Sequence, residues 1–241
     1  CDIASKLKVD FFQGDENNVL KRYYDAAKKF NADIVLRVTG DCPLIDFKII
    51  TKNIKKFKIS KYDYLSNTIN PTYPDGLDFE IFSFKTLSTA FKLAKNHFDK
   101  EHVTPFIKRN RTLFKIKNIE HKENLSDIRL TIDYKKDLNV IKKVFKAYNN
   151  DNYITLESIE KIINSSKEIF MGNNNFIRDE IKYSSKGQKL WQVAKKIIPG
   201  GNMLLSKRPE MFLPDVWPTY YSKASGCYVW DLNNNKFIDF C

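Results

Sequence analysis

The sequence predicts an α/β protein in which a mixed, mostly parallel sheet is flanked by helices, followed by a smaller C-terminal segment of one helix and a β-hairpin. Two observations lead to this prediction. Apolar strand-like runs alternate with amphipathic helical patterns along most of the chain. Loops rich in glycine, proline and asparagine separate many of these segments. The 241 residues are enough for one to two domains with a buried core.

The first part of the chain follows the order strand, helix, strand. Residues 9–12 form a short strand-like run, and residues 19–30 carry apolar side chains at three- and four-residue spacing, which predicts a helix. Residues 33–38 are almost continuously apolar, as is typical of a strand that is buried on both faces of a sheet. This strand ends at the turn Thr39-Gly40-Asp41-Cys42-Pro43, and the whole pattern indicates a βαβ unit.

The alternation continues toward residue 163. Helices are expected at 47–57, 84–95, 101–108, 138–148 and 154–163, and strands at 63–67, 77–82, 114–116 and 128–132. The strand at 77–82 alternates apolar and acidic residues, which predicts a half-exposed strand and favours an antiparallel excursion. A linker is expected between residues 171 and 185, before a basic helix at 189–198 and an Asn-rich hairpin at 226–239.

Composition limits the classes of function. The hydrophobic share of 42% and the charged share of 29% argue against disordered, collagen-like and membrane-bundle proteins. The formal net charge of +12 can indicate a nucleic-acid or acidic-lipid partner, but few arginines and scattered lysines favour a lysine-rich background. The cysteines (Cys1, Cys42, Cys227 and Cys241) lack zinc-site spacing, which favours a reducing cytoplasm. No apolar run approaches the roughly 20 residues that span a bilayer.

Candidate metal ligands follow two of the predicted strands. Asp41 comes after the strand at 33–38, behind Gly40, and Asp133 comes after the strand at 128–132. Ligands of open α/β sheets gather beyond the carboxyl ends of the strands. Mg²⁺ commonly takes one or two protein carboxylates together with phosphate oxygens and water. The two residues can therefore share an Mg²⁺ ion, and a helix N-cap or turn role for Asp41 is an equal alternative. Asp137 is expected to cap a helix.

Three further polar residues are ambiguous. His102 can help to deprotonate a nucleophile, or it can be a structural histidine that begins a helix. Asp78 and Glu80 fall on one face of the strand at 77–82, and that face can simply be the solvated one.

Six separated segments resemble, in the same order, the cytidylyltransferases of surface-sugar biosynthesis, in particular the spore coat polysaccharide type. The segments are Phe12-Gln13-Gly14 with residues 18–24, residues 37–45, Ser66-Asn67-Thr68, residues 73–80, Glu101-His102-Val103-Thr104-Pro105, and residues 129–133 with Asp137-Leu138. The resemblance implies a nucleotide-diphospho-sugar transferase fold. It also implies transfer of CMP from CTP to a sugar acid or sugar phosphate, with release of pyrophosphate.

The same resemblance implies roles for individual residues. Asp41 and Asp133 are the implied Mg²⁺ ligands, and they form the catalytic group with Arg37 and His102. The implied substrate-binding residues on the sugar and phosphate side are Asn67, Asp78, Glu80 and Glu101. The family opens with a strand and a glycine-rich basic loop, which residues 1–14 do not match. We therefore expect at least one further strand-loop-helix unit upstream, and no nucleotidyl transfer by the 241 residues alone.

The end of the chain resembles the N-terminus of class III aminotransferases, particularly the glutamate-1-semialdehyde aminomutase type. The matching residues are Lys189-Leu190-Trp191, residues 194–201, residues 226–232 and Phe237-Ile238-Asp239. The resemblance implies a pyridoxal phosphate enzyme whose Schiff-base lysine lies downstream. Arg208 lies near the place where relatives bind a substrate carboxylate through an arginine. The alternative is a small capping hairpin with Trp230 in its core.

These observations predict a cytidylyltransferase-like domain at 1–183 and the start of an aminotransferase at 184–241. The expected whole is a cytoplasmic bifunctional enzyme of polysaccharide biosynthesis that uses an amino donor and is a homodimer when full length. The chain itself is expected to be an internal piece of that protein. No nucleic-acid or membrane partner is expected. The alternative is a nucleotide-sugar binding or scaffold module without catalysis, and nucleic-acid binding ranks last.

Overall fold

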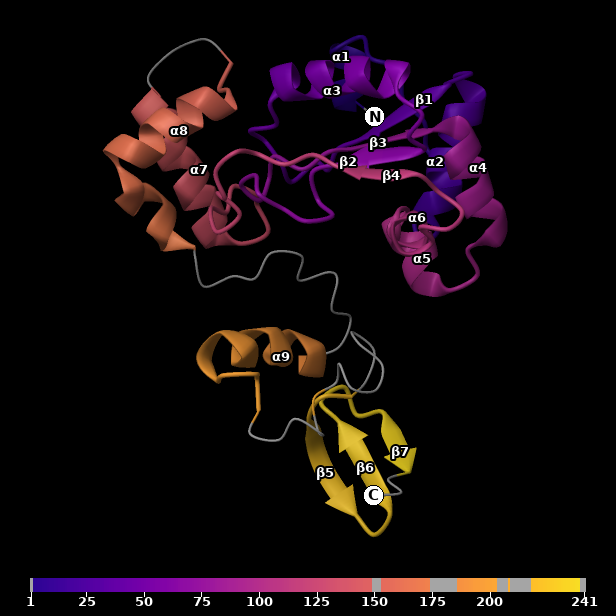
Figure 1. Cartoon of the computed structure of the whole chain (residues 1–241), viewed down its shortest axis with the longest axis vertical. Coiled ribbons are helices and arrows are strands. Elements are labelled where there is room, and N and C mark those ends of the chain that lie inside the picture. The colour runs from indigo at the N-terminus through magenta and orange to yellow at the C-terminus, as the bar shows by residue number, and fades with distance from the viewer. Residues whose placement is uncertain (1, 149–152, 174–185, 203–207, 209–217, 239–241) are drawn as a thin grey trace. The chain divides into compact units, whose positions relative to one another are not determined.

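The structure, a computed structural model, describes residues 2–148, 153–173, 186–202, 208 and 218–238. The chain divides into two compact units, Cys1–Asn174 and Asn175–Cys241 (Figure 1). The predicted domain boundary between residues 183 and 184, and most of the predicted linker, lie outside the described residues. Within the described ranges, no helix is long and apolar enough to cross a membrane.

A four-stranded mixed sheet with the strand order β1-β3-β2-β4 organises the first unit. Its strands are β1 (Ile34–Arg37), β2 (Tyr64–Ser66), β3 (Glu80–Ser83) and β4 (Ile116–Asn118). β3 runs antiparallel to both β1 and β2, whereas β2 and β4 are parallel. β1, β2 and β4 therefore point the same way. This arrangement confirms the predicted mixed sheet and its antiparallel excursion, with three of the four strands in one direction and two of the three pairings antiparallel.

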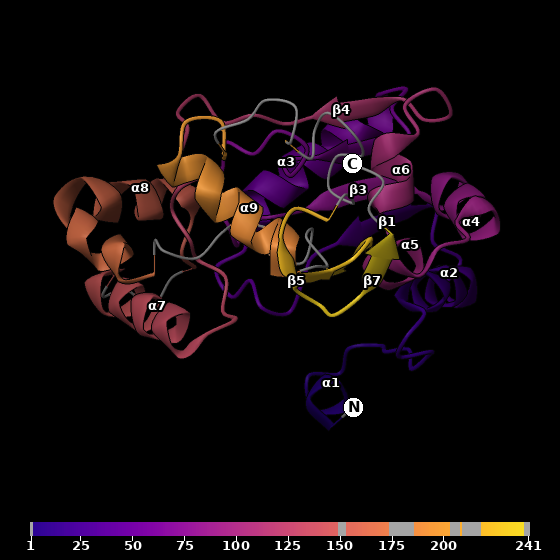
Figure 2. The same ribbon diagram turned by 90° about the horizontal axis from the view of Figure 1, so that it is seen from below.

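Helices cover both faces of this sheet. The helical segments of the first unit are α1 (Asp2–Lys6), α2 (Val19–Lys29), α3 (Phe47–Ile59), α4 (Phe84–Leu93), α5 (His97–His102), α6 (Pro105–Arg109), α7 (Lys135–Tyr148), α8 (Leu156–Ser165) and the 3₁₀ helix η1 (Lys167–Gly172). Leu65 and Ile81 belong to a core cluster with α3, α7 and α8, whereas Tyr64 and Phe82 belong to a second cluster with α2, α4 and α6. Adjacent strand residues point to opposite faces, so each cluster fills one side of the sheet. Figures 1 and 2 show α7 and α8 at one end of this unit and α2 and α4 at the other.

β3 is buried on both faces, which corrects the prediction that this strand is half-exposed. Ile81 and Phe82 are 0% exposed, and the acidic Glu80 is only 2% exposed. A period-two alternation shows which side chains share a face, but it does not show whether another element covers that face. Here the acidic side chain is buried because ion pairs and hydrogen bonds satisfy it.

Other elements also differ from the sequence prediction. No strand forms at 9–12, where Val9 is 58% exposed and Phe11 is 43% exposed. The predicted helix at 101–108 is instead split between α5 and α6. Val103 has a φ of 72°, and α6 begins at Pro105, which has no N–H for a preceding helical turn. Residues 128–132 contribute one isolated bridge, between Arg129 and Asp75, in place of a strand.

The described part of the second unit contains one helix and one small antiparallel sheet. These are α9 (Lys186–Ile197), β5 (Tyr221–Ser225), β6 (Tyr228–Asp231) and β7 (Lys236–Ile238), with the strand order β5-β6-β7. The predicted helix and hairpin are confirmed, and β5 is an additional strand. The carboxylate of Asp231 accepts hydrogen bonds from the backbone N–H groups of Asn233 and Asn235, each at 2.8 Å, and so closes the Asn-rich turn.

Candidate active site

The loop after β1 lies against the segment that carries Asp133. The backbone N–H of Ile132 donates to the carbonyl oxygen of Asp41 at 2.9 Å, and the Thr131 hydroxyl donates to the same oxygen at 3.3 Å. The side chain of Asp133 is 42% exposed, and Asp41 is half-buried. The two candidate metal ligands therefore come from adjacent segments. Their role as metal ligands stays a prediction.

Arg129 is the buried centre of this carboxylate-rich region. Its guanidinium donates to Asp133 at 2.5 Å, to Asp137 at 3.0 Å and to Asp75 at 3.1 Å, and its side chain is 5% exposed. Burial opposes ionisation of Asp137. Hydrogen bonds from Arg129, from Asn173 and from two backbone N–H groups nevertheless lower the pKa of Asp137 below its ordinary value. Both N–H groups, those of Asp133 and Tyr134, precede α7, so Asp137 caps this helix as the sequence predicts.

Several carboxylates gather at this edge, and most of them are engaged by Arg129. Three carboxylates surround the single charge of Arg129, and Asp41 adds a fourth on the adjacent segment. Among the described residues, no group of three or more His, Cys, Asp or Glu side chains is arranged to hold a metal. An ion held by Asp41 and Asp133 would therefore complete its shell with phosphate oxygens and water, as Mg²⁺ commonly does.

A second, cationic group is built around Glu80. Its carboxylate accepts from Arg37 Nη1 at 2.5 Å and from Lys108 Nζ at 2.9 Å. The hydroxyls of Tyr64 and Thr104 donate to Oε1 of Glu80 at 2.5 and 2.7 Å. Burial alone would raise the pKa of Glu80, but the charges of Lys108 and Arg37 and the hydrogen bond from Tyr64 lower it to about 2. Glu80 is therefore ionised at neutral pH, and the group carries a net charge of +1.

His102 lies at the end of α5, beside this cationic group, with a side chain that is 22% exposed. Burial is the largest influence on its pKa and lowers it. Nearby Glu101 opposes that shift, while the positive charge of Arg37 adds to it, and the net pKa lies below the ordinary value. The neutral imidazole, which can accept a proton, is thus the dominant form at pH 7. Glu101 itself is 51% exposed, with Oε2 3.4 Å from His97 Nδ1 and 3.9 Å from His102 Nε2.

Asn67 links the two groups through the segment before β3. Its buried side-chain amide donates to the carbonyl oxygen of Leu77 at 2.9 Å and accepts from the backbone N–H of Phe79 at 3.0 Å. These contacts flank Asp78, which is half-buried.

Burial is the main reason that the pKa of the Cys42 thiol rises to about 12, and the charges of Asp41 and Asp78 add to this rise. Asp78 therefore belongs electrostatically to the carboxylate side, and Glu80 to the cationic side.

The sequence alone did not indicate three members of the cationic group: Tyr64, Thr104 and Lys108. Tyr64 lies inside an apolar strand, where an aromatic residue is ordinarily core. Thr104 lies in the segment 101–105, where the resemblance implies roles for Glu101 and His102 alone, and Lys108 lies beyond it in the helix predicted at 101–108. The separation of four residues between Thr104 and Lys108 places both on one side of a helical turn, and this spacing is the one signal that could have linked them.

Arg208 belongs to the second unit, together with the Pro-Gly-Gly motif. A Cβ atom added to Gly200 would lie 1.9 Å from Nη2 of Arg208, and the φ of Gly200 is 76°. A Cβ atom on Gly201 would likewise lie 2.4 Å from the ring of Trp191. The two glycines thus allow the arginine and the tryptophan to pack closely against the loop. The predicted contact of Arg208 with a substrate carboxylate stays a prediction.

The fold is similar to that of a solved cytidylyltransferase. A solved structure of a cytidylyltransferase from Leptospira borgpetersenii matches with a TM-score of 0.66 and 32% identity, over 70% of this chain and 71% of that one. Residues 2–182 match the family described as "Cytidylyltransferase", and the chain belongs to this family.

Two curated relatives extend the comparison. "Uncharacterized protein MJ1063" of Methanocaldococcus jannaschii is 35% identical over 176 residues, which are 72% of this chain and 71% of the relative. "Spore coat polysaccharide biosynthesis protein SpsF" of Bacillus subtilis is 25% identical over 162 residues, 65% of each chain. The chain thus spans somewhat less than two thirds of the SpsF protein.

A separate, short similarity concerns glutamate-1-semialdehyde 2,1-aminomutases. The protein of Nitrosopumilus maritimus is 43% identical over 53 residues, which are 22% of this chain and 11% of that protein. The protein of Methanothrix thermoacetophila is 35% identical over 57 residues, 24% of this chain and 12% of that protein. The chain therefore covers only a small part of either aminomutase.

Proposed function

We propose that residues 1–183 are part of a cytidylyltransferase domain that, in the full-length protein, transfers CMP from CTP to a sugar acid or sugar phosphate in surface polysaccharide biosynthesis. The supporting observation is the adjacency of the Asp41 loop and the segment before Asp133, on the same sheet as the cationic group around Glu80. Membership in the cytidylyltransferase family and the similarity to SpsF support the nucleotide and the pathway.

In the proposed reaction, a sugar oxygen attacks the α-phosphorus of CTP, and the bond to the pyrophosphate oxygen breaks. Mg²⁺ bound to Asp41 and Asp133 would supply charge neutralisation on the phosphates. Neutral His102 accepts the proton of the attacking hydroxyl, in keeping with its lowered pKa. Arg37 offsets the negative charge of the transferred group.

The remaining site residues orient the acceptor. Asp78 and Glu101 bind sugar hydroxyls, because both carboxylates are at least partly accessible. Asn67 and Glu80 are buried and act through the groups that they hold: Asn67 fixes the backbone on both sides of Asp78, and Glu80 fixes Arg37. Positioning of this kind lowers the entropic cost of bringing the two substrates together.

The test compares Asp41→Asn with Asp127→Asn in the full-length protein. Asp127 is exposed and lies outside the site, so its substitution is a matched control. Calorimetry measures binding of CTP with Mg²⁺, and a coupled assay measures release of pyrophosphate. The enzyme proposal requires turnover that Asp41→Asn abolishes while the fold is retained. Binding of CTP with no turnover in either protein would favour the nucleotide-sugar binding or scaffold module.

We further propose that residues 184–241 begin a pyridoxal phosphate-dependent class III aminotransferase or aminomutase, fused to the first domain in a cytoplasmic homodimer. The short similarity to the aminomutases supports this proposal, as does the packing of Arg208 on Gly200. By the family resemblance, the Schiff-base lysine and the phosphate ligands of the cofactor lie outside these residues. The fused domain would use an amino donor.

Absorbance spectroscopy of the full-length protein tests the fusion. Pyridoxal phosphate in a Schiff base is expected to give a band that shifts when an amino donor is added, and size-exclusion chromatography with light scattering reports the dimer. A full-length protein that shows no cofactor band after incubation with pyridoxal phosphate would exclude the aminotransferase half.

A further inference from the structure

Two cationic side chains share one buried carboxylate in the first unit. Arg37 Nη1 donates to Oε2 of Glu80, and Lys108 Nζ lies 2.9 Å from Oε1. The other two partners of Glu80, Tyr64 and Thr104, are neutral hydroxyl donors. The cluster therefore holds two positive charges against one negative charge. A surplus positive charge next to a buried carboxylate favours the approach of an anion.

The hydrogen-bond donors of the two cations are only partly used within the protein. The ammonium of Lys108 has three N–H donors, and its described contacts are with Glu80 and with Thr68 Oγ1 at 3.0 Å. Nε of Arg37 is buried and has no hydrogen-bond partner within the described part of the chain. The side chains of Lys108 and Arg37 are 34% and 23% exposed, so a ligand can reach both.

Glu80 holds the two cationic groups in fixed positions. Its Oε1 accepts from Tyr64, Thr104 and Lys108, so the carboxylate has little freedom to turn. Arg37 and Lys108 bind different oxygens of this carboxylate and are thereby held side by side. A pair of cations that is positioned before the ligand arrives binds an anion with less loss of conformational entropy.

We propose that Lys108 and Arg37, held by Glu80, form the binding site for the anionic group of the acceptor, either the carboxylate of a sugar acid or the phosphate of a sugar phosphate. This inference rests on the proposed cytidylyltransferase function and assigns the anionic group of its acidic acceptor to two particular cations. Lys108 is the specificity-determining residue, because neutral sugars leave its surplus charge uncompensated. Glu80 is a positioning residue that acts through the two cations.

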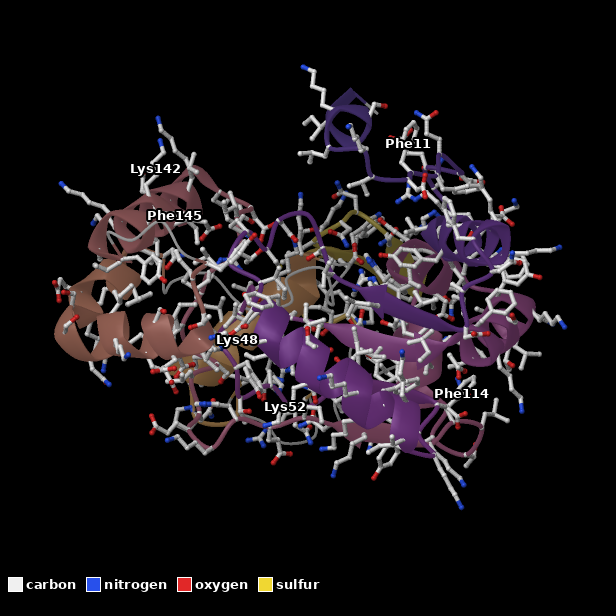
Figure 3. All side chains as sticks on the ribbon, turned by 90° about the horizontal axis from the view of Figure 1, so that it is seen from above. Phe11, Lys48, Lys52, Phe114, Lys142 and Phe145 are labelled. Carbon is white, nitrogen blue, oxygen red and sulfur yellow. The ribbon has the colours of Figure 1, made fainter. Side chains whose placement is uncertain are left out.

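Calorimetric titration of the full-length protein provides the first test. The probes are inorganic phosphate, glucuronate as a carboxylate sugar, and glucose as the neutral reference. Lys108→Met removes the charge and keeps the apolar stem, whereas Lys108→Arg keeps a charge. Lys142→Met is the matched control, because Lys142 is an exposed lysine that projects from α7 away from the sheet (Figure 3).

The expected result is binding of phosphate or glucuronate that Lys108→Met weakens by about tenfold or more, the usual effect of losing a charge-assisted hydrogen bond. The affinities of Lys108→Arg and Lys142→Met for these anions are expected to stay within about threefold of the wild-type values. The first variant keeps a positive charge at position 108, and the second leaves Lys108 itself in place. Preference for glucuronate over phosphate identifies a sugar acid as the acceptor, and the reverse identifies a sugar phosphate. Equal affinities in wild type and Lys108→Met, or binding of neither anion, would overturn the proposal.

Chemical protection of the wild-type protein supplies a test that needs no variant. Acetic anhydride acetylates exposed lysines, and mass spectrometry quantifies the product at each site. Saturating phosphate or glucuronate is expected to lower acetylation of Lys108 several-fold and to leave Lys142 unchanged. Equal protection of both lysines would contradict a defined site.

Titration with CTP and Mg²⁺ in the same samples separates this inference from the proposed function. Binding of CTP with no Lys108-dependent binding of either anion refutes the acceptor site alone. Anion binding that depends on Lys108, in a protein that does not bind CTP, leaves the site intact and refutes the cytidylyltransferase function.

Discussion

Replacement of Glu80 by glutamine tests the electrostatic basis of the cationic group. The variant keeps the size of the side chain but removes its charge, so Arg37 and Lys108 face a neutral amide. The pKa of Glu80 falls from an ordinary 4.5 to about 2 in the folded protein. At about 1.4 kcal/mol for each tenfold change, this difference corresponds to about 3 kcal/mol of stability at pH 7. Removal of one partner from a buried ion pair typically costs a similar amount, about 3–5 kcal/mol.

The pH dependence has a definite sign. A carboxyl group whose pKa is lowered by folding stabilises the protein fully above about pH 4.5, and this contribution is lost as the pH falls toward about 2. The difference between wild type and Glu80→Gln is therefore expected to shrink from about 3 kcal/mol at pH 7 to about 1 kcal/mol at pH 3. Taking this difference cancels the other carboxylates, which titrate in both proteins.

Urea denaturation at pH 7 and at pH 3 measures both quantities. Far-UV circular dichroism is the suitable probe, because Trp191, Trp217 and Trp230 all follow the first unit in the sequence. The control is Glu157→Gln, which removes an exposed carboxylate 3.1 Å from Lys161 and is expected to leave the denaturation midpoint unchanged. A Glu80→Gln variant as stable as the wild type at pH 7, or a difference that stays constant between the two pH values, would refute the reasoning.

Three further predictions concern other parts of the first unit. Asn67→Ala leaves a buried carbonyl and a buried N–H without partners, so it is expected to cost about 2 kcal/mol or more in urea denaturation, whereas exposed Asn124→Ala serves as the control. Gly76→Ala is expected to lower the melting temperature by several degrees or prevent folding, since Gly76 has a φ of 101° and a Cβ atom there would lie 2.5 Å from the Leu130 carbonyl carbon. A change of less than one degree would contradict this prediction. The thiol of Cys42 is buried with a pKa of about 12, and it is expected to resist iodoacetamide at pH 8 while exposed Cys227 reacts, as followed by peptide mass spectrometry.

The strand-end carboxylates were accessible to sequence reasoning for a general reason. Chain ends of strands that point the same way meet at one edge of a sheet, so the order of apolar runs and acidic turns groups Asp41 with Asp133, although residues 128–132 form one isolated bridge in place of the expected strand. The Asp41 loop and the segment before Asp133 are indeed joined by a backbone hydrogen bond. The role of Arg129 was not accessible. Its bonds to Asp75 and Asp137 depend on how a loop and a helix start pack around it, and no local spacing encodes that packing.

Glu80 shows the limit of sequence patterns most clearly. Alternation along residues 77–82 identifies its face correctly but leaves open whether that face meets water or another element. The deciding partners are Arg37 on the neighbouring strand β1 and Lys108 on α6, which lies 28 positions farther along the chain. A lysine in a lysine-rich chain carries no distinguishing mark, so its importance arises only from the carboxylate it meets. The buried carboxylate of Glu80 fixes the position of this partly exposed lysine.

The short segment before β3 connects the carboxylate side of the candidate site with the cationic group around Glu80. Asn67 on the turn after β2 holds the backbone at Leu77 and Phe79, between which Asp78 faces the carboxylate side. Glu80, the residue after Phe79, begins β3 and holds the cationic side chains of Arg37 and Lys108. Only Phe79 separates Asp78 from Glu80, so a shift of the backbone that Asn67 holds would move both side chains. Substitution of Asn67 is therefore expected to disturb both halves of the site at once, whereas substitution of Lys108 disturbs only the cationic half.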